Sequence, residues 1–153
     1  MTSLRLCVRR SEVLEPDGPA TAVTLRLPSD VECIEEAVAL LTYHCTAGAT
    51  ASERLRFRLQ VVLAEALANA ILRGNSSDAD KHVEVRVVLR PAEMRLHVTD
   101  EGPGFDPGAV PEPLGADAVH EPNGRGLFLI RHLSDAVSFT PRGNSICITL
   151  RRR

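Results

Sequence analysis

The stretch Glu65-Ala-Leu-Ala-Asn-Ala-Ile-Leu-Arg-Gly-Asn75 lies at the end of the longest helix-periodic segment of the chain, predicted to begin near Ser52. Glu65, Asn69 and Arg73 are four residues apart, so their side chains project from one side of that helix. A carboxylate in an otherwise apolar helix is costly to bury unless it is paired or faces a cleft. The Glu65 carboxylate could accept a proton from an attacking hydroxyl, and the Asn69 amide oxygen could be a ligand for magnesium. The other interpretation is that Glu65 and Asn69 lie on the solvated side of an amphipathic helix.

A glycine-rich turn, Asp100-Glu-Gly-Pro-Gly-Phe105, comes directly after the alternating residues Met94–Thr99. Gly102 and Gly104 allow the backbone to approach a flat ligand closely and to adopt positive φ. An aspartate at a strand end can accept a hydrogen bond from an exocyclic amine. The spacing is not GxGxxG and no parallel βαβ unit surrounds it, which disfavours a Rossmann site. The alternative is a plain surface turn.

A third motif, Gly124-Arg-Gly-Leu127, opens a helix predicted at about Gly126–Leu133. Free backbone N–H groups and the helix dipole make such a start a natural cradle for phosphate. Arg125 could add a charged contact. The alternative interpretation is a simple glycine turn that leads into a helix.

The order of predicted elements is β-β-α-α-β-β-loop-α-β-β. This order predicts an α+β fold, a two-layer α/β sandwich with a mixed, mainly antiparallel sheet and helices on one face. Residues 1–153 form one predicted domain, with a hairpin extension over 1–20 and a loop rich in proline and glycine at 106–123. The predicted strands are 3–14, 22–27, 82–89, 94–99, 136–140 and 145–150, and the predicted helices are 31–45, 52–73 and 126–133.

The composition gives no reason to expect a nucleic-acid or membrane partner, since the net charge is −2 and 25% of the residues are charged. No run approaches the ~18–20 apolar residues that a membrane-spanning helix needs, and no signal peptide is visible. The four cysteines lack CxxC spacing, and the five histidines lack metal-ligand spacing. We therefore expect a cytoplasmic protein with reduced thiols.

Together and in this order, the three motifs resemble the GHKL, or Bergerat-fold, ATP-binding superfamily, which includes DNA gyrase and sensor histidine kinases. Within it the chain is similar to the small bacterial anti-sigma-factor serine/threonine kinases. The resemblance runs from about Val23 to Leu150, nearly the whole chain. It implies a Bergerat fold, with ATP and Mg²⁺ as cofactors and a homodimer as the assembly.

The resemblance also implies roles for individual residues. Glu65 matches the general base that activates the attacking hydroxyl, and Asn69 matches the magnesium ligand. Asp100 matches the aspartate that receives the adenine amine, and residues 106–123 become the nucleotide lid. The other matched nucleotide-binding positions are Arg73, Gly102, Gly104, Gly124, Arg125, Gly126, Leu127 and Ser145. The chain departs from the family pattern at Arg73, where a histidine is common, and at Ser145, where a Gly-Thr pair is usual.

The function implied by this resemblance is an ATP-dependent kinase that phosphorylates a serine or threonine of an anti-sigma-factor antagonist. A sigma factor would be the competing partner. Two other functions stay open. A nucleotide-gated module would bind ATP and a partner without transferring phosphate. A detached ATPase domain of a histidine kinase would need a helical dimerisation hairpin with a phosphoacceptor histidine, whereas the predicted helix that holds His44 is single.

Overall fold

The computed structural model describes residues 6–47, 51–104 and 122–152, without the side chains of 122–124. Six strands in this part of the chain form one sheet in the order β1-β2-β3-β4-β6-β5. The strands are β1 (Val8–Glu15), β2 (Gly18–Pro28), β3 (His82–Leu89), β4 (Glu93–Thr99), β5 (Ala136–Phe139) and β6 (Ser145–Arg151). The helices are α1 (Ile34–Thr46), preceded by the 3₁₀ turn Val31–Cys33, α2 (Glu53–Asn69), extended by the π-helical turn Ala70–Gly74, and α4 (Pro122–Leu133).

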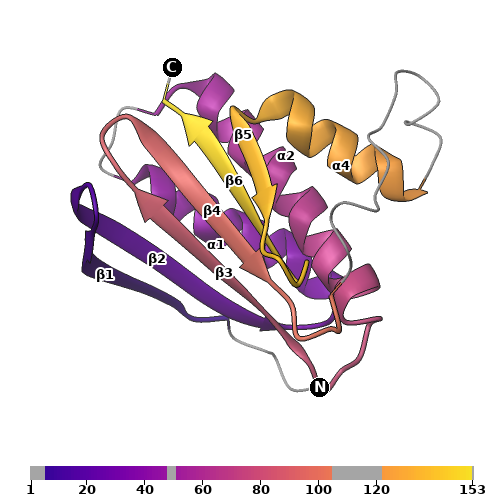
Figure 1. Cartoon of the computed structure of the whole chain (residues 1–153). Coiled ribbons are helices and arrows are strands. Elements are labelled where there is room, and N and C mark those ends of the chain that lie inside the picture. The colour runs from indigo at the N-terminus through magenta and orange to yellow at the C-terminus, as the bar shows by residue number, and fades with distance from the viewer. Residues whose placement is uncertain (1–5, 48–50, 105–121, 153) are drawn as a thin grey trace.

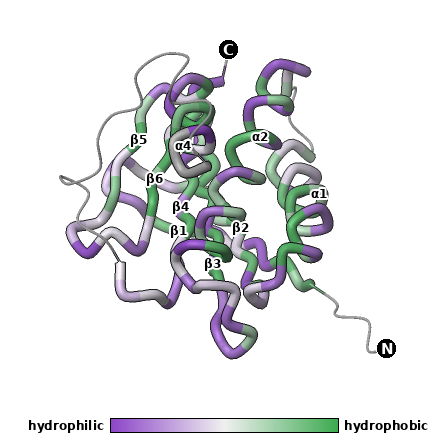
Figure 2. Tube along the Cα trace, turned by 90° about the vertical axis from the view of Figure 1, so that its right-hand side faces the viewer, coloured by the Kyte–Doolittle hydropathy of each residue, from purple (hydrophilic) through white to green (hydrophobic). Residues whose placement is uncertain are grey.

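The structure has two layers, because α1, α2 and α4 lie on one face of the sheet (Figure 1). A view turned by 90° shows α1 and α2 side by side along that face (Figure 2). This confirms the predicted α+β sandwich. The sheet was expected to be mixed, but all five pairings of the described strands are antiparallel. Three hairpins, β1–β2, β3–β4 and β5–β6, make up most of the sheet. β2 pairs with β3 across the connection that contains α1 and α2, and β4 pairs with β6.

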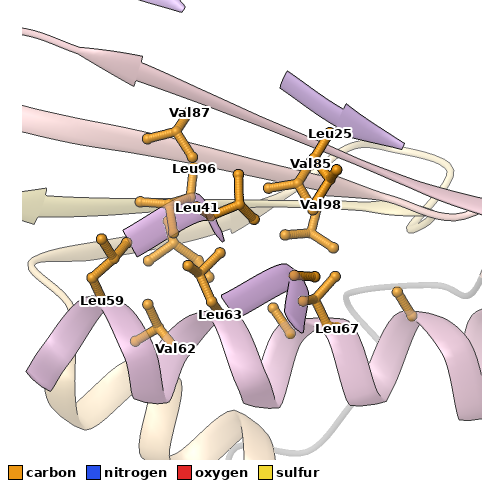
Figure 3. Close-up of a cluster of buried hydrophobic side chains, with 14 of the residues drawn as sticks. Leu25, Leu41, Leu59, Val62, Leu63, Leu67, Val85, Val87, Leu96 and Val98 are labelled. Carbon is orange, nitrogen blue, oxygen red and sulfur yellow. The ribbon is translucent and has the colours of Figure 1, made fainter. Parts of the chain in front are cut away.

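The core lies between α2 and the sheet (Figure 3). Leu59, Leu63 and Leu67 recur at four-residue spacing on α2, and each is 0% exposed. They face Leu96 and Val98 of β4 and the neighbouring buried residues of β2 and β3. Complete burial of one such leucine contributes roughly 1.5–3 kcal/mol. The core therefore fixes one side of α2 on the sheet and leaves the adjacent side, which holds Glu65 and Asn69, for other contacts.

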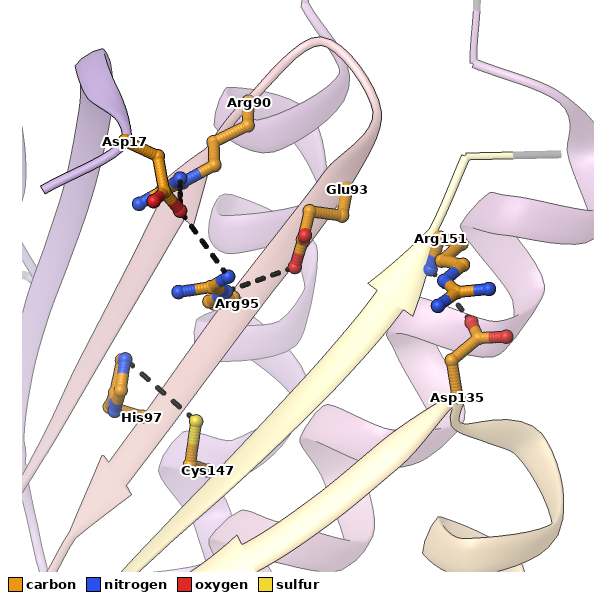
Figure 4. A network of polar contacts seen from close by, with 8 residues as sticks. All are labelled: Asp17, Arg90, Glu93, Arg95, His97, Asp135, Cys147 and Arg151. Atoms are coloured by element: carbon orange, nitrogen blue, oxygen red, sulfur yellow. Dashed lines mark hydrogen bonds and ion pairs between the residues drawn. The ribbon is translucent and has the colours of Figure 1, made fainter. Parts of the chain in front are cut away.

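The predicted N-terminal hairpin is confirmed, and it turns at Pro16-Asp17. The Asp17 carboxylate reaches across the sheet end to the guanidinium groups of Arg90, at 2.6 Å, and Arg95, at 3.8 Å (Figure 4). Arg95 also pairs with Glu93 at 3.0 Å. Because the Asp17 side chain is 63% exposed, these pairs set the position of the turn more than they stabilise the fold.

A buried arginine joins the end of α4 to α2 and β6. Arg58 of α2 donates from Nε to the Leu133 carbonyl at 2.8 Å and from Nη1 to the Arg151 carbonyl at 3.0 Å. Its Nη2 pairs with Asp135 at 2.7 Å, and the two side chains are only 7% and 9% exposed. Asp135 also accepts the Arg151 backbone N–H, the contact drawn in Figure 4. The C-terminal end of α4 is thus fixed by a buried charge pair with several hydrogen bonds.

Helix α4 begins at Pro122, about one turn earlier than the predicted start at Gly126. Proline is well suited to the first position of a helix, because its missing N–H would have no partner there. Gly124 and Gly126 are therefore inside the helix and do not precede it. No helix in the described part of the chain is long and apolar enough to cross a membrane.

Candidate functional site

A cavity of about 330 Å³ opens where the end of α2, the end of β4 and the β5–β6 turn meet. Its lining includes six of the predicted site residues, namely Asn69, Arg73, Asp100, Gly104, Leu127 and Ser145. Residues from distant parts of the sequence therefore line one cavity. The volume is in the range of small-molecule sites. Phe105 and residues 106–121, which include most of the predicted nucleotide lid, lie outside the described residues.

Asp100 is held at the end of β4 by backbone and side-chain hydrogen bonds. Its N–H donates to the Asn144 carbonyl at 2.9 Å, and its Oδ1 accepts the Gly102 N–H at 2.8 Å. Burial raises the pKa of the Asp100 carboxyl above its ordinary value, although the Gly102 hydrogen bond and the charge of Arg142 oppose this shift. A half-buried carboxylate at the cavity wall is a suitable acceptor for an amine of a planar ligand.

Two glycines make room for this carboxylate. A Cβ on Gly74 would overlap Asp100 Oδ2, and a Cβ on Gly102 would overlap the Gly74 carbonyl oxygen. The turn after β4 therefore packs directly against the end of the π-helical turn. Gly104 has a φ of +81°, and a Cβ there would meet the Arg142 carbonyl. Substitution at any of these glycines would displace the Asp100 turn.

Asn75, which was not predicted as a site residue, connects three segments behind the Asp100 turn. It is 0% exposed. Its Nδ2 donates to Ser29 Oγ at 2.7 Å and to the His82 carbonyl at 2.9 Å, and its Oδ1 accepts the Glu101 N–H at 2.8 Å. Because Glu101 follows Asp100, this asparagine sets where the carboxylate stands. The sequence offered one signal, an asparagine directly after the glycine that ends the long helix.

Asn144 and Arg142 are two further residues at the site that were not predicted as site residues. Asn144 Nδ2 donates to the Asp100 carbonyl at 3.3 Å, and Arg142 Nη2 donates to the Gly102 carbonyl at 3.3 Å. Ser145 shares a 2.8 Å hydrogen bond with Thr99, the residue before Asp100. The β5–β6 turn therefore also supports the Asp100 turn.

Glu65 and Asn69 lie where α4 packs on α2. A Cβ on Gly126 would stand 3.0 Å from Glu65 Oε2 and 3.3 Å from Asn69 Nδ2. A glycine at this position thus lets the two helices approach over both polar side chains. Asn69 lines the cavity, whereas Glu65 lies one helical turn away on the same side of α2 and outside the cavity lining.

The third motif differs most from its prediction. Gly124, Arg125 and Gly126 were expected to offer free N–H groups at a helix start, but Gly126 is in the second turn of α4. Its observed contact is with Glu65 and Asn69. Arg125 is exposed and lies outside the cavity lining, and Leu127 supplies an apolar wall. In this structure Gly126 packs against Glu65 and Asn69, and only Leu127 of the motif lines the cavity.

Residues 27–150 match the histidine kinase-like ATPase domain. The chain belongs to this family of ATPase domains. It is also 31% identical to the serine/threonine-protein kinase BtrW of Bordetella bronchiseptica over 101 residues, which cover 65% of this chain and 71% of that protein. The resemblance to the GHKL superfamily is thereby confirmed, and the cavity between α2, β4 and the β5–β6 turn is the nucleotide-site candidate of a histidine kinase-like ATPase domain.

Proposed function

We propose that this ATPase domain is a protein kinase of the anti-sigma-factor type, which transfers the γ-phosphate of ATP to a serine or threonine of a small regulatory protein. One observation carries the proposal. Asn69 and Asp100 line the same cavity from opposite segments, and Glu65 stands one turn from Asn69 on the same side of α2. An amine acceptor and an amide oxygen therefore line one cavity, and a carboxylate stands one helical turn from the amide. The similarity to a serine/threonine-protein kinase supports the same conclusion.

Each residue has a defined part in this proposal. Asp100 accepts the exocyclic amine of adenine, while Leu127 and the glycine turn hold the flat base. The substrate hydroxyl oxygen forms a bond to the γ-phosphorus, the bond from that phosphorus to the bridging oxygen breaks, and ADP leaves. The hydroxyl proton passes to the Glu65 carboxylate. Arg73, exposed at the cavity wall, is available to the phosphates.

Magnesium fits the residues at the polar end of the site. The Asn69 amide lies at the cavity wall, and an amide oxygen with phosphate oxygens is a donor set that Mg²⁺ commonly takes. When bound, Mg²⁺ would neutralise charge on the phosphates. The proposed partners are an anti-sigma-factor antagonist as substrate and a sigma factor as competitor, in the cytoplasm and without nucleic acid or membrane.

The test uses the full chain, Mg²⁺, radiolabelled ATP and the candidate antagonist protein. Glu65→Gln should abolish phosphate transfer and leave ATP affinity within about threefold, because the carboxylate acts on the hydroxyl and not on the nucleotide. Glu53→Gln, an exposed residue in the first turn of the same helix, is the control and should transfer phosphate normally. Equal transfer by wild type and Glu65→Gln would refute the role of Glu65.

A second function, a nucleotide-gated binding module without phosphate transfer, is favoured by one observation. Glu65 lies against Gly126 of α4 and outside the cavity lining. A module of this kind would hold its partner only with ATP bound, and Glu65→Gln would not change that binding. Partner affinity with and without ATP, measured beside phosphate transfer, distinguishes the two functions.

A further inference from the structure

A second cavity lies at the opposite end of β4 from the nucleotide-site candidate. Its volume is about 320 Å³, which is within the range of small-molecule sites. It opens where the C-terminal end of α1, the β1–β2 hairpin, the β3–β4 turn and the end of β6 meet. The β3–β4 turn and the far end of β4 lie at opposite ends of the sheet (Figure 1), and this seven-residue strand spans about 20 Å. Part of the lining precedes residue 27, where the family match begins.

Three arginine side chains give this cavity its positive charge. Arg10 of β1 and Arg152, just after β6, make no ion pair within the part of the chain that the structure describes. Arg90 pairs with Asp17, but its Nε is buried and has no hydrogen-bond partner among the described residues. Burial raises the pKa of the Cys45 thiol in the cavity lining, and the charges of Arg10 and Arg152 oppose this shift. Both guanidinium groups therefore act on one part of the cavity wall.

The fold uses only some of the donors of these arginines. Arg10 donates from Nη1 to the His44 carbonyl at 2.9 Å, and Arg152 donates from Nε to the Arg90 carbonyl at 2.8 Å. Because a guanidinium group has five N–H donors, both side chains are held in place and keep donors for a ligand. The planar arrangement of these donors matches pairs of phosphate oxygens. A phosphate monoester, with a charge of about −1.5 to −2 at pH 7, balances the two arginines that lack ion pairs.

The rest of the wall suits an uncharged group that carries hydroxyls. Pro19, Leu89 and Pro91 supply apolar surface. Glu12 is the one carboxylate among the described lining residues, and its Oε1 accepts the Thr21 hydroxyl at 3.0 Å. Its Oε2 is then an acceptor for a ligand hydroxyl, whereas its charge would repel a second anionic group. The cavity is also larger than the five heavy atoms of a phosphate ion require.

We propose that this cavity binds the phosphate monoester of a small hydroxylated compound. The phosphate lies between Arg10 and Arg152, and Arg90 adds a third positive charge to the same wall. The organic group lies against the apolar surface of the cavity, where one of its hydroxyls donates to Glu12. This site is separate from the nucleotide-site candidate and takes no part in the proposed phosphate transfer.

Calorimetric titration of the full chain with glycerol 3-phosphate tests the site. Wild type should bind this probe with a Kd below about 1 mM. Arg10→Gln and Arg152→Gln should each weaken binding at least about tenfold, because each removes charge-assisted hydrogen bonds. Arg9→Gln is the matched control, since Arg9 is an exposed arginine of the same strand that lies outside the cavity lining. Equal affinities of the Arg10→Gln and Arg9→Gln variants, or no binding by wild type at about 10 mM probe, would overturn the proposal.

Two further probes separate the phosphate from the organic group. Glycerate, a carboxylate with a single negative charge, should bind at least about tenfold more weakly than glycerol 3-phosphate. Inorganic phosphate should also bind about tenfold more weakly, because it leaves the apolar surface and Glu12 without contacts. Equal affinity for inorganic phosphate would refute the assignment of a monoester.

Competition with a nucleotide shows which cavity the probe occupies. ADP with Mg²⁺ should leave the affinity for glycerol 3-phosphate unchanged within about twofold, because the two cavities lie at opposite ends of β4. Displacement of the probe by ADP would place it in the nucleotide-site candidate and refute the second site. None of these measurements depends on phosphate transfer, so the proposal stands or fails apart from the kinase function.

Discussion

Replacing Asn75 with alanine should destabilise the fold through hydrogen bonds that no other group can replace. The Glu101 N–H and the His82 carbonyl lose their bonds to the asparagine, of 2.8 and 2.9 Å. Ser29 keeps its 2.9 Å bond to the Lys81 carbonyl, so it is not left unpaired. Each buried polar group without a partner costs about 1–3 kcal/mol. Two such groups give an expected loss in the free energy of unfolding of Asn75→Ala of about 2–6 kcal/mol.

Urea unfolding followed by circular dichroism measures this loss. With a slope of about 1–3 kcal/mol per molar urea, the midpoint of the Asn75→Ala transition should fall by on the order of 1–2 M. Asp80→Ala, an exposed change in the loop that follows, should stay within about 0.5 kcal/mol of the wild type. ATP affinity of the folded variant should also fall, because the Glu101 N–H holds the Asp100 turn. A change in unfolding free energy below about 0.5 kcal/mol would refute the reasoning.

Three other predictions concern the site, the buried ion pair and the thiols. Because burial raises the pKa of the Asp100 carboxyl, ionising it opposes folding once the pH exceeds the unfolded value of 3.8. Asp100→Asn should therefore raise the thermal unfolding midpoint at pH 7 but not below about pH 3.8. The same variant should weaken ATP binding by about 10–100-fold in calorimetry. A lower unfolding midpoint at pH 7 would contradict the effect of burial on the Asp100 carboxyl. Arg58→Met leaves Asp135 buried without its cation and should lower the free energy of unfolding in urea by about 3–5 kcal/mol. Arg58→Lys should recover little of this loss, since one ammonium group cannot reproduce the planar guanidinium. A loss below about 1 kcal/mol for Arg58→Met would argue against the buried pair. Burial raises the pKa of the Cys45 thiol to about 12, whereas Cys7 is exposed. A thiol reagent at pH 8 should thus modify Cys7 rapidly and spare Cys45, and rapid labelling of a Cys7→Ser variant at Cys45 would show that the helix layer opens.

The order of helices and strands could be predicted because apolar spacing follows the geometry of each element. Leu59, Leu63 and Leu67 show the helical period, and the residues of β4 alternate along the strand. The three motifs were assigned to one nucleotide site by the resemblance to the GHKL superfamily, because the spacing of apolar residues does not tell which element ends meet. The pairing of β6 with β4 was not available in this way, because sequence patterns do not tell which strands become neighbours.

The residues that support the site could not be predicted, because their roles arise only from contacts between distant segments. Arg58 looks like any charge on an amphipathic helix until its three acceptors, from α4, β6 and the turn between α4 and β5, are seen. Asn75 appears in sequence as the end of a helix, and its partners are Ser29, just after β2, His82 of β3 and Glu101 of the Asp100 turn. Gly126 belongs to a sequence motif that resembles a phosphate-binding loop. Its position beside Glu65 depends on where α4 crosses α2.

The buried ion pair of Arg58 fixes the C-terminal end of α4, so a rotation of this helix would displace mainly its N-terminal end. Leu133 is held beside that pair, and Gly126 lies seven residues away, about 10 Å along a helix that rises 1.5 Å per residue. A tilt of only about 10° around the fixed end would displace Gly126 by roughly 2 Å, more than enough to separate it from Glu65. Access to the carboxylate can thus change by a small rotation of one rigid element, while the sheet and α2 stay in place.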